Sequence, residues 1–191
     1  MERRELLKQI ALLTGGVFIG GELFLSGGCK SGNDASTVGA FTPEHIAFLD
    51  EVAETIIPTT GTPGAKAAQV GTFMTVMVND CYTTADQKIF KEGISQLDAA
   101  CEKAHNATFI KATPEQRTSL LTAIDKEAKE YQNNKKKEEP NHYFTMMKQL
   151  CLLGYFTSEI GATKALRYVA VPGKYDGNVS YTKGDKAWAT S

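Results

Sequence analysis

Apolar residues recur at helical spacing in five stretches of the chain, separated by short polar or proline-containing segments. The first stretch follows Phe41, where Thr42 can cap a helix that has Pro43 at its first position, and it stops at Pro58. The other four predicted helices cover residues 67–80, 83 to about 105, 113 to about 132 and 142 to about 153. The pattern predicts an all-α fold.

Polar residues at the expected helix starts support this assignment. The segment 113–116 (Thr-Pro-Glu-Gln) repeats the cap, proline and acidic or amide pattern of the first helix. Before the third helix, Thr83 has Asp86 or Gln87 as the partner of a capping box. These signals fix where three of the five helices begin.

The fifth predicted helix is apolar over much of its circumference, which is typical of a helix at the centre of a bundle or of one covered by a partner. We expect Gly154 to end this helix. Thr157 or Ser158 can then cap a short sixth helix that ends near Tyr168. After that point no helical period remains.

The pattern as a whole predicts an irregular bundle of about five to six helices over residues 41–170, followed by an extended C-terminal arm over residues 171–191. A chain of 191 residues with 42% hydrophobic content is long enough for one compact domain. It is too short to add a cofactor-binding catalytic domain. The formal net charge of -1 gives no electrostatic footprint for nucleic acid.

Residues 1–28 have the layout of an export signal. Arg3 and Arg4 stand directly before an apolar, glycine-rich run over residues 10–21, as in twin-arginine signals, which carry cargo that has already folded. The run is shorter than the roughly 20 residues needed to cross a bilayer, and Glu22 interrupts it, which argues against a membrane-spanning helix. We expect the mature protein to be periplasmic.

Cys29 follows small residues that close the apolar segment, an arrangement similar to the cleavage box of a bacterial lipoprotein. Its thiol would then carry a lipid that anchors the chain to a membrane; simple cleavage nearby is the alternative. Residues 29–40 consist mainly of Ser, Gly, Asn, Asp and Ala. This composition predicts a flexible tether.

Side chains with catalytic or metal-binding chemistry form no recognisable motif. The three histidines are isolated, so we expect surface or capping roles for them. Asp50, Glu51 and Glu54 share one helix, and an exposed helix face accounts for them. The loop 59–63 is rich in Thr and Gly, but it follows no strand and contains a proline, which argues against phosphate binding. We therefore expect no catalytic residue, metal ligand or cofactor site in this chain.

Cys81, Cys101 and Cys151 are spaced too widely for a paired metal site or a c-type haem motif. In an oxidising compartment, one disulfide plus a free or intersubunit thiol is one interpretation. Buried, inert thiols are the other, because Cys101 and Cys151 lie on apolar helix faces.

Aromatic residues gather near the C-terminus on a backbone broken by Gly and Pro. The run from residue 154 to 177 contains Tyr155, Phe156, Tyr168 and Tyr175, with Arg167 and Lys174 between them. Side chains of these types carry binding energy at protein interfaces. A tail packed over its own domain fits the composition equally well.

This run, together with segments 53–58 and 62–65, resembles the gluconate 2-dehydrogenase subunit 3 family over roughly residues 41–177. The resemblance implies a non-catalytic small subunit that aids the export, maturation and stability of a partner, an FAD-dependent dehydrogenase of the glucose-methanol-choline (GMC) type. The FAD would lie in that partner, which would oxidise a sugar, sugar acid or glycoside and pass electrons to a cytochrome c subunit.

Within the C-terminal run, we expect partner contacts at Tyr155, Phe156, Glu159, Arg167, Tyr168 and Tyr175. Trp188 is the only tryptophan and lies in a polar tail, so we expect it to anchor on a neighbouring surface. The alternative function is a free-standing helical lipoprotein that acts as an adaptor or cell-envelope scaffold.

Overall fold

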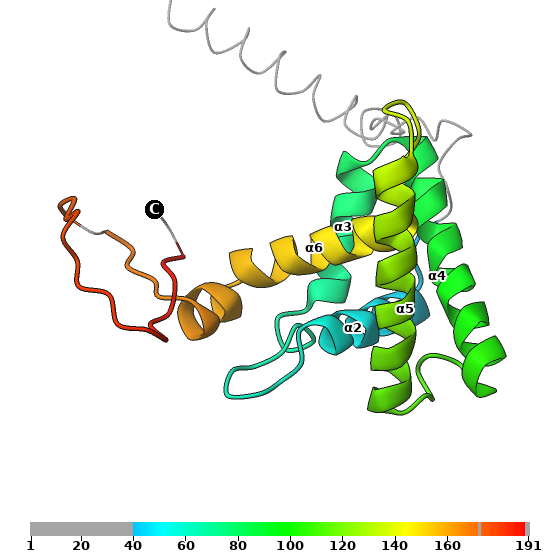
Figure 1. Ribbon diagram of the computed structural model, residues 1–191, viewed down its shortest axis with the longest axis horizontal. Helices are drawn as coiled ribbons and strands as arrows, with labels where there is room; N and C mark the ends of the chain where they lie inside the picture. The colour runs from blue at the N-terminus through cyan, green and yellow to red at the C-terminus, as the bar shows by residue number, and fades with distance from the viewer. Residues whose placement is uncertain (1–39, 172, 190–191) are drawn as a thin grey trace, which may run out of the picture. The chain divides into compact units, whose positions relative to one another are not determined.

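The computed structural model describes residues 40–171 and 173–189, which all belong to one compact unit. Regular structure in this part is helical (Figure 1). The helices are α2 (Pro43–Ile56), α3 (Val70–Cys81), α4 (Thr84–His105), α5 (Pro114–Asn134), α6 (Tyr143–Thr157) and the short π-helix η1 (Gly161–Ala165). The only paired extended backbone among the described residues is an isolated bridge between Arg167 and Trp188. The prediction of an irregular all-α bundle is confirmed.

The N-terminal features predicted from the sequence lie outside the described residues. They are Arg3 and Arg4 of the export signal, the Cys29 lipidation site and the tether as far as residue 39. Among the helices that the structure describes, none combines the length and the hydrophobicity that crossing a bilayer requires.

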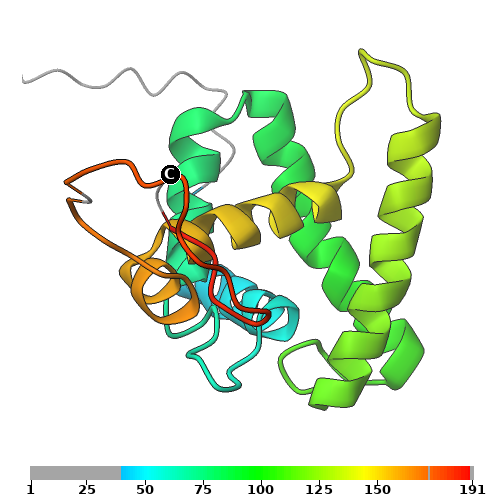
Figure 2. The same ribbon diagram turned by 60° about the vertical axis from the view of Figure 1, so that its left-hand side comes forward.

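The centre of the bundle is α6, which packs against α2, α3, α4 and α5. Figures 1 and 2 both show α6 running at a steep angle to α5, so the bundle is not a set of parallel helices. The buried residues of α6 come from several sides of the helix: Phe144, Met146, Met147, Leu150, Cys151, Gly154 and Tyr155. Burial among the other helices of the same chain therefore explains most of its apolar circumference, whereas Leu152, Leu153 and Phe156 remain exposed.

Helices α2 and α3 approach each other closely at Gly71. A Cβ at this position would lie 2.6 Å from Asp50 Oδ1 and 2.7 Å from the backbone oxygen of Ile46. The Gly71 N–H donates to Asp50 Oδ1 at 2.8 Å, so a side chain of α2 satisfies one of the free N–H groups at the start of α3. The absence of a side chain at Gly71 and this hydrogen bond together allow α2 and α3 to pack closely.

The three predicted N-cap threonines are confirmed, and two of these helix starts form a capping box. Thr42 and Thr113 each form a capping box with the residue three positions later, His45 and Gln116. Thr83 caps α4 by accepting from the Asp86 N–H, but it forms no capping box, because the Gln87 amide instead donates to the Asn79 and Tyr82 backbone oxygens. His45 thus has the capping role that was expected of an isolated histidine.

Two predicted boundaries are wrong. Gly154 does not end α6; it lies inside the helix, where a Cβ would meet the Phe73 ring of α3 at 2.5 Å, so this glycine allows close helix packing. The second helix begins at Val70 instead of residue 67, because residues 65–69 form turns that end in left-handed Gln69 (φ 54°). The first error comes from a tertiary contact that overrides a local signal, and the second from local turn geometry.

Cys81, Cys101 and Cys151 are free thiols, so the interpretation with a disulfide among these three is wrong. Cys101 and Cys151 are buried and Cys81 is exposed. Burial, with a smaller contribution from the Glu54 carboxylate, raises the pKa of Cys151 to about 12. The Cys151 thiol is therefore protonated at neutral pH and unreactive.

Replacing Gly71 with Ala should lower the free energy of unfolding by about 1–3 kcal/mol, because the new methyl group would push α2 and α3 apart at a backbone contact. Chemical denaturation followed by circular dichroism measures this change. Gly61→Ala is the matched control, since no heavy atom lies within 4 Å of a Cβ there. Equal stabilities of the two variants would contradict the close approach of the helices.

Candidate partner-binding surface

The loop between α2 and α3, residues 57–69, is held in place by one carboxylate. The Thr59 N–H and hydroxyl donate to Glu54 Oε1 at 2.8 and 2.7 Å, and the Lys66 N–H donates to Oε2 at 2.9 Å. Burial raises the pKa of Glu54, but these hydrogen bonds outweigh it and leave the pKa lowered overall. The loop is thus built around an ionised Glu54.

The same loop is joined to α6 by Tyr155. Its hydroxyl donates to the Pro63 backbone oxygen at 2.6 Å, and its ring is packed in the core with only 1% of the residue exposed. The expectation that Tyr155 contacts a partner is therefore corrected. Burying this large ring in the core removes more apolar surface from water than leaving it on the surface would, and so stabilises the fold.

Two further carboxylates of α2 also have structural partners. Glu51 forms ion pairs with Lys66 and with Arg117 of α5, and Asp50 accepts from Gly71 at the start of α3. Asp50, Glu51 and Glu54 are each partly buried, so the interpretation of an exposed helix face is wrong. No group of three or more potential metal ligands occurs within the described ranges.

The chain leaves the core through a tight turn after α6. The Ser158 hydroxyl donates to the Tyr155 backbone oxygen at 2.6 Å and accepts from the Gly161 N–H at 3.0 Å, so Ser158 caps this turn as expected. A Cβ on Gly161 would overlap the Tyr155 backbone oxygen. Only glycine fits there. The π-helix η1 follows and ends before Tyr168.

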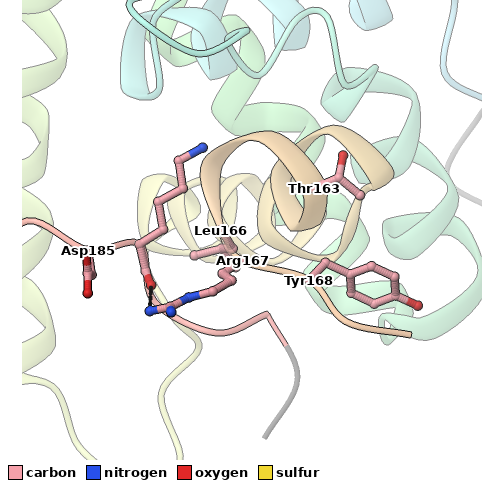
Figure 3. Close-up of a pocket in the computed structure, with 6 residues that line it drawn as sticks. Thr163, Leu166, Arg167, Tyr168 and Asp185 are labelled. Carbon is pink, nitrogen blue, oxygen red and sulfur yellow. Dashed lines mark hydrogen bonds between the residues drawn. The ribbon is translucent and has the colours of Figure 1, made fainter. Parts of the chain in front are cut away.

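Arg167 and Trp188 bring the two ends of the arm together. The Arg167 N–H donates to the Ala187 oxygen, and the Ala189 N–H donates to the Arg167 oxygen, both at 2.8 Å. The Arg167 guanidinium donates to the Lys186 oxygen at 3.0 Å, the bond drawn in Figure 3, and lies 4.3 Å from the centre of the Trp188 ring. Residues 168–187 consequently form a closed loop, which we call the C-terminal loop.

Most of the large side chains of the C-terminal loop point into solvent. Tyr175 is 96% exposed, Val171 81% and Tyr181 75%, and Tyr168 is about half exposed. Of the predicted contact residues outside the loop, Phe156 and Glu159 are exposed and Arg167 is partly buried, while Trp188 is 47% exposed. Sequence reasoning did not single out Val171 and Tyr181, whose only signal is an apolar side chain among polar neighbours.

A shallow pocket lies at the base of the C-terminal loop, lined by Thr163, Leu166, Arg167, Tyr168, Asp185 and Lys186. Figure 3 shows Tyr168 directed away from Arg167, so the two side chains do not close over a ligand. Small-molecule sites are enclosed and largely apolar. This pocket is open and polar, which favours a protein contact over a bound metabolite.

Comparison with known proteins gives one match. The family model described as gluconate 2-dehydrogenase subunit 3 matches residues 43–173. The matched range runs from α2 to the start of the C-terminal loop and includes Glu54, Tyr155 and Arg167, whereas Tyr175 and Trp188 lie beyond it. No match was found among curated proteins or among solved structures.

Replacing Glu54 with Gln should lower the free energy of unfolding at pH 7 by about 1–3 kcal/mol, because the amide nitrogen faces N–H and hydroxyl donors that it cannot satisfy. The pKa of Glu54 is lowered in the folded protein, so its stabilisation is present above the unfolded value near 4.5 and is lost as the pH falls further. The difference between wild type and variant should therefore shrink below about pH 4.5.

Denaturant titrations between pH 3 and pH 7 measure this difference. Glu130→Gln, on the exposed side of α5, is the control and should change stability by less than about 0.5 kcal/mol at every pH. A difference between wild type and Glu54→Gln that stays constant across the range would contradict the role of the ionised carboxylate.

Proposed function

Because this chain belongs to the gluconate 2-dehydrogenase subunit 3 family, we propose that it is a non-catalytic small subunit that binds an FAD-dependent dehydrogenase of the GMC type through its C-terminal loop. The observation that carries the proposal is the exposure of Val171, Tyr175 and Tyr181 on a loop that stands outside a well-packed core. Soluble proteins rarely leave such side chains uncovered over one segment without a binding role.

The length of the C-terminal loop supports an interface. Loops longer than about 12–15 residues without regular structure are mostly functional or disordered, and residues 168–187 are held at both ends by the Arg167–Trp188 contact. Tyrosine buries a large area at low entropic cost and keeps a polar tip, so exposed tyrosines on a closed loop suit a protein partner.

A non-catalytic role agrees with how the polar side chains of the bundle are used. Glu51, Glu54 and Asp50 each bind groups of their own chain, and Asp125 pairs with Lys129 and Lys148. In this proposal the FAD and the residues that oxidise a sugar, sugar acid or glycoside belong to the partner subunit. A cytochrome c subunit of the complex receives the electrons.

The export role rests on the sequence pattern at Arg3 and Arg4. A flavoprotein acquires its cofactor in the cytoplasm, so a partner without a signal of its own has to cross the membrane already folded, together with this chain. Lipid on Cys29 would then keep the complex at the membrane on the periplasmic side. The free-standing adaptor is the competing outcome, which purification of this chain without any flavoprotein would support.

Replacing Tyr175 and Tyr181 with Ala should weaken binding to the dehydrogenase by about tenfold or more for each residue, since each change removes an exposed ring from the interface. The measurement is co-purification from the native host followed by titration of the flavoprotein, detected by its visible absorbance. Ile110→Ala is the control, because Ile110 is exposed in the loop between α4 and α5, and Figure 1 shows this loop on the opposite side of the bundle from the C-terminal loop. Unchanged affinity in both tyrosine variants would contradict the interface.

Replacing Arg3 and Arg4 with Lys should leave the flavoprotein in the cytoplasm, because both arginines belong to the export signal. Dehydrogenase activity in separated periplasmic and cytoplasmic fractions measures the effect. Lys8→Arg in the same segment controls for a general change in charge and should leave export intact. Export of the dehydrogenase at the normal level with both arginines replaced would remove the carrier role.

A further inference from the structure

At the base of the C-terminal loop, residues 164–167 contact residues 186–189. Two backbone hydrogen bonds flank Trp188, a third bond runs from the Arg167 guanidinium to the Lys186 oxygen, and the Lys186 ammonium donates to the Lys164 oxygen. The guanidinium also covers the Trp188 ring. Residues about 20 positions apart in sequence are thereby held side by side.

Closing a loop of this length costs conformational entropy. If the arm were open in the free protein, that cost would be part of every binding event and would lower the affinity. A loop that is already closed presents its side chains together. The contacts between Arg167 and Trp188 therefore keep the loop closed in the free protein, before it binds a partner.

We propose that Arg167 and Trp188 form a clasp that closes the C-terminal loop into its binding shape, so that both act as positioning residues and the exposed loop side chains make the contacts. The inference rests on the proposed function, and its occupant is the flavoprotein. It reassigns Arg167 and Trp188 from partner contacts to the support of those contacts. Partial burial of Arg167 agrees with this role.

The charges of the loop indicate what kind of surface it binds. Its cationic residues are Lys174, Lys183 and Lys186, and its anionic residues are Asp176 and Asp185. The loop is thus close to neutral, while its large exposed side chains are tyrosines and valines. The matching surface on the flavoprotein is apolar, and binding should change little between 50 and 500 mM salt.

The first test separates positioning from contact by kinetics. Arg167→Ala should lower the association rate constant for the purified flavoprotein about tenfold, because only the closed fraction of molecules can bind, and should leave the dissociation rate constant nearly unchanged. It should also speed hydrogen exchange at the Ala189 N–H, which donates to Arg167 in the clasp. A higher dissociation rate with normal association would instead make Arg167 a contact residue.

The second test replaces the clasp by a covalent bond. Bridged neighbours of this kind lie about 4.8 Å apart, within the range of about 4.4–6.8 Å that a disulfide spans between Cα atoms. The variant Arg167→Cys with Trp188→Cys, made in a background with Cys29→Ser and Cys81→Ser, removes both side chains and still closes the loop when oxidised. Oxidised protein should bind the flavoprotein at the wild-type association rate, and reduced protein about tenfold more slowly.

The outcomes distinguish the inference from the proposed function. If wild-type protein binds the flavoprotein and the oxidised disulfide variant does not, Arg167 and Trp188 touch the partner and the clasp is refuted. If wild type and Arg167→Ala bind alike, the clasp is also refuted while the proposed function stands. If wild-type protein does not bind the flavoprotein, both proposals fail, whatever the hydrogen exchange of Ala189 shows.

Discussion

Tyr155 connects the three parts of the described chain. Its ring lies in the core, its hydroxyl bonds to Pro63 in the loop between α2 and α3, and its backbone oxygen accepts from Ser158 where the chain turns toward η1. Because Gly161 packs directly on that same oxygen, the direction in which the arm leaves the bundle depends on the end of α6. The position of the proposed partner-binding surface thus depends on Tyr155, a buried residue that cannot itself contact the partner.

The parts of the fold that could be predicted depend on local sequence. In α4 the apolar stripe is buried throughout: Phe90, Ile94, Leu97 and Cys101. This burial could be predicted, because the residues of one helix face recur at a fixed spacing in the sequence. Caps could be predicted for the same reason: Thr113 and Gln116 are three positions apart. The all-α bundle follows from adding these local signals.

The parts that could not be predicted depend on residues distant in sequence. Gly154 indicates a helix end when read locally, but it serves packing against Phe73 on another helix. Three of the α2 carboxylates look like an exposed face until Lys66, Gly71 and Arg117 are known to surround them. Likewise, the arm could be identified as irregular and aromatic, but nothing in its composition pairs Arg167 with Trp188. The N-terminal signal, lipidation and location remain predictions.

The position of α6 in the chain order has a consequence for biosynthesis. This helix is the centre of the bundle, and it contacts α2, which is distant in sequence. The Cys151 thiol, for example, approaches the backbone oxygen of Ala53, 98 positions earlier in the chain. While a ribosome has yet to release residues 143–157, the four preceding helices can contact one another but lack the helix on which all four pack. The bundle is therefore completed late, after translation of almost the entire chain, and its folding rate is governed by contacts of high sequence separation.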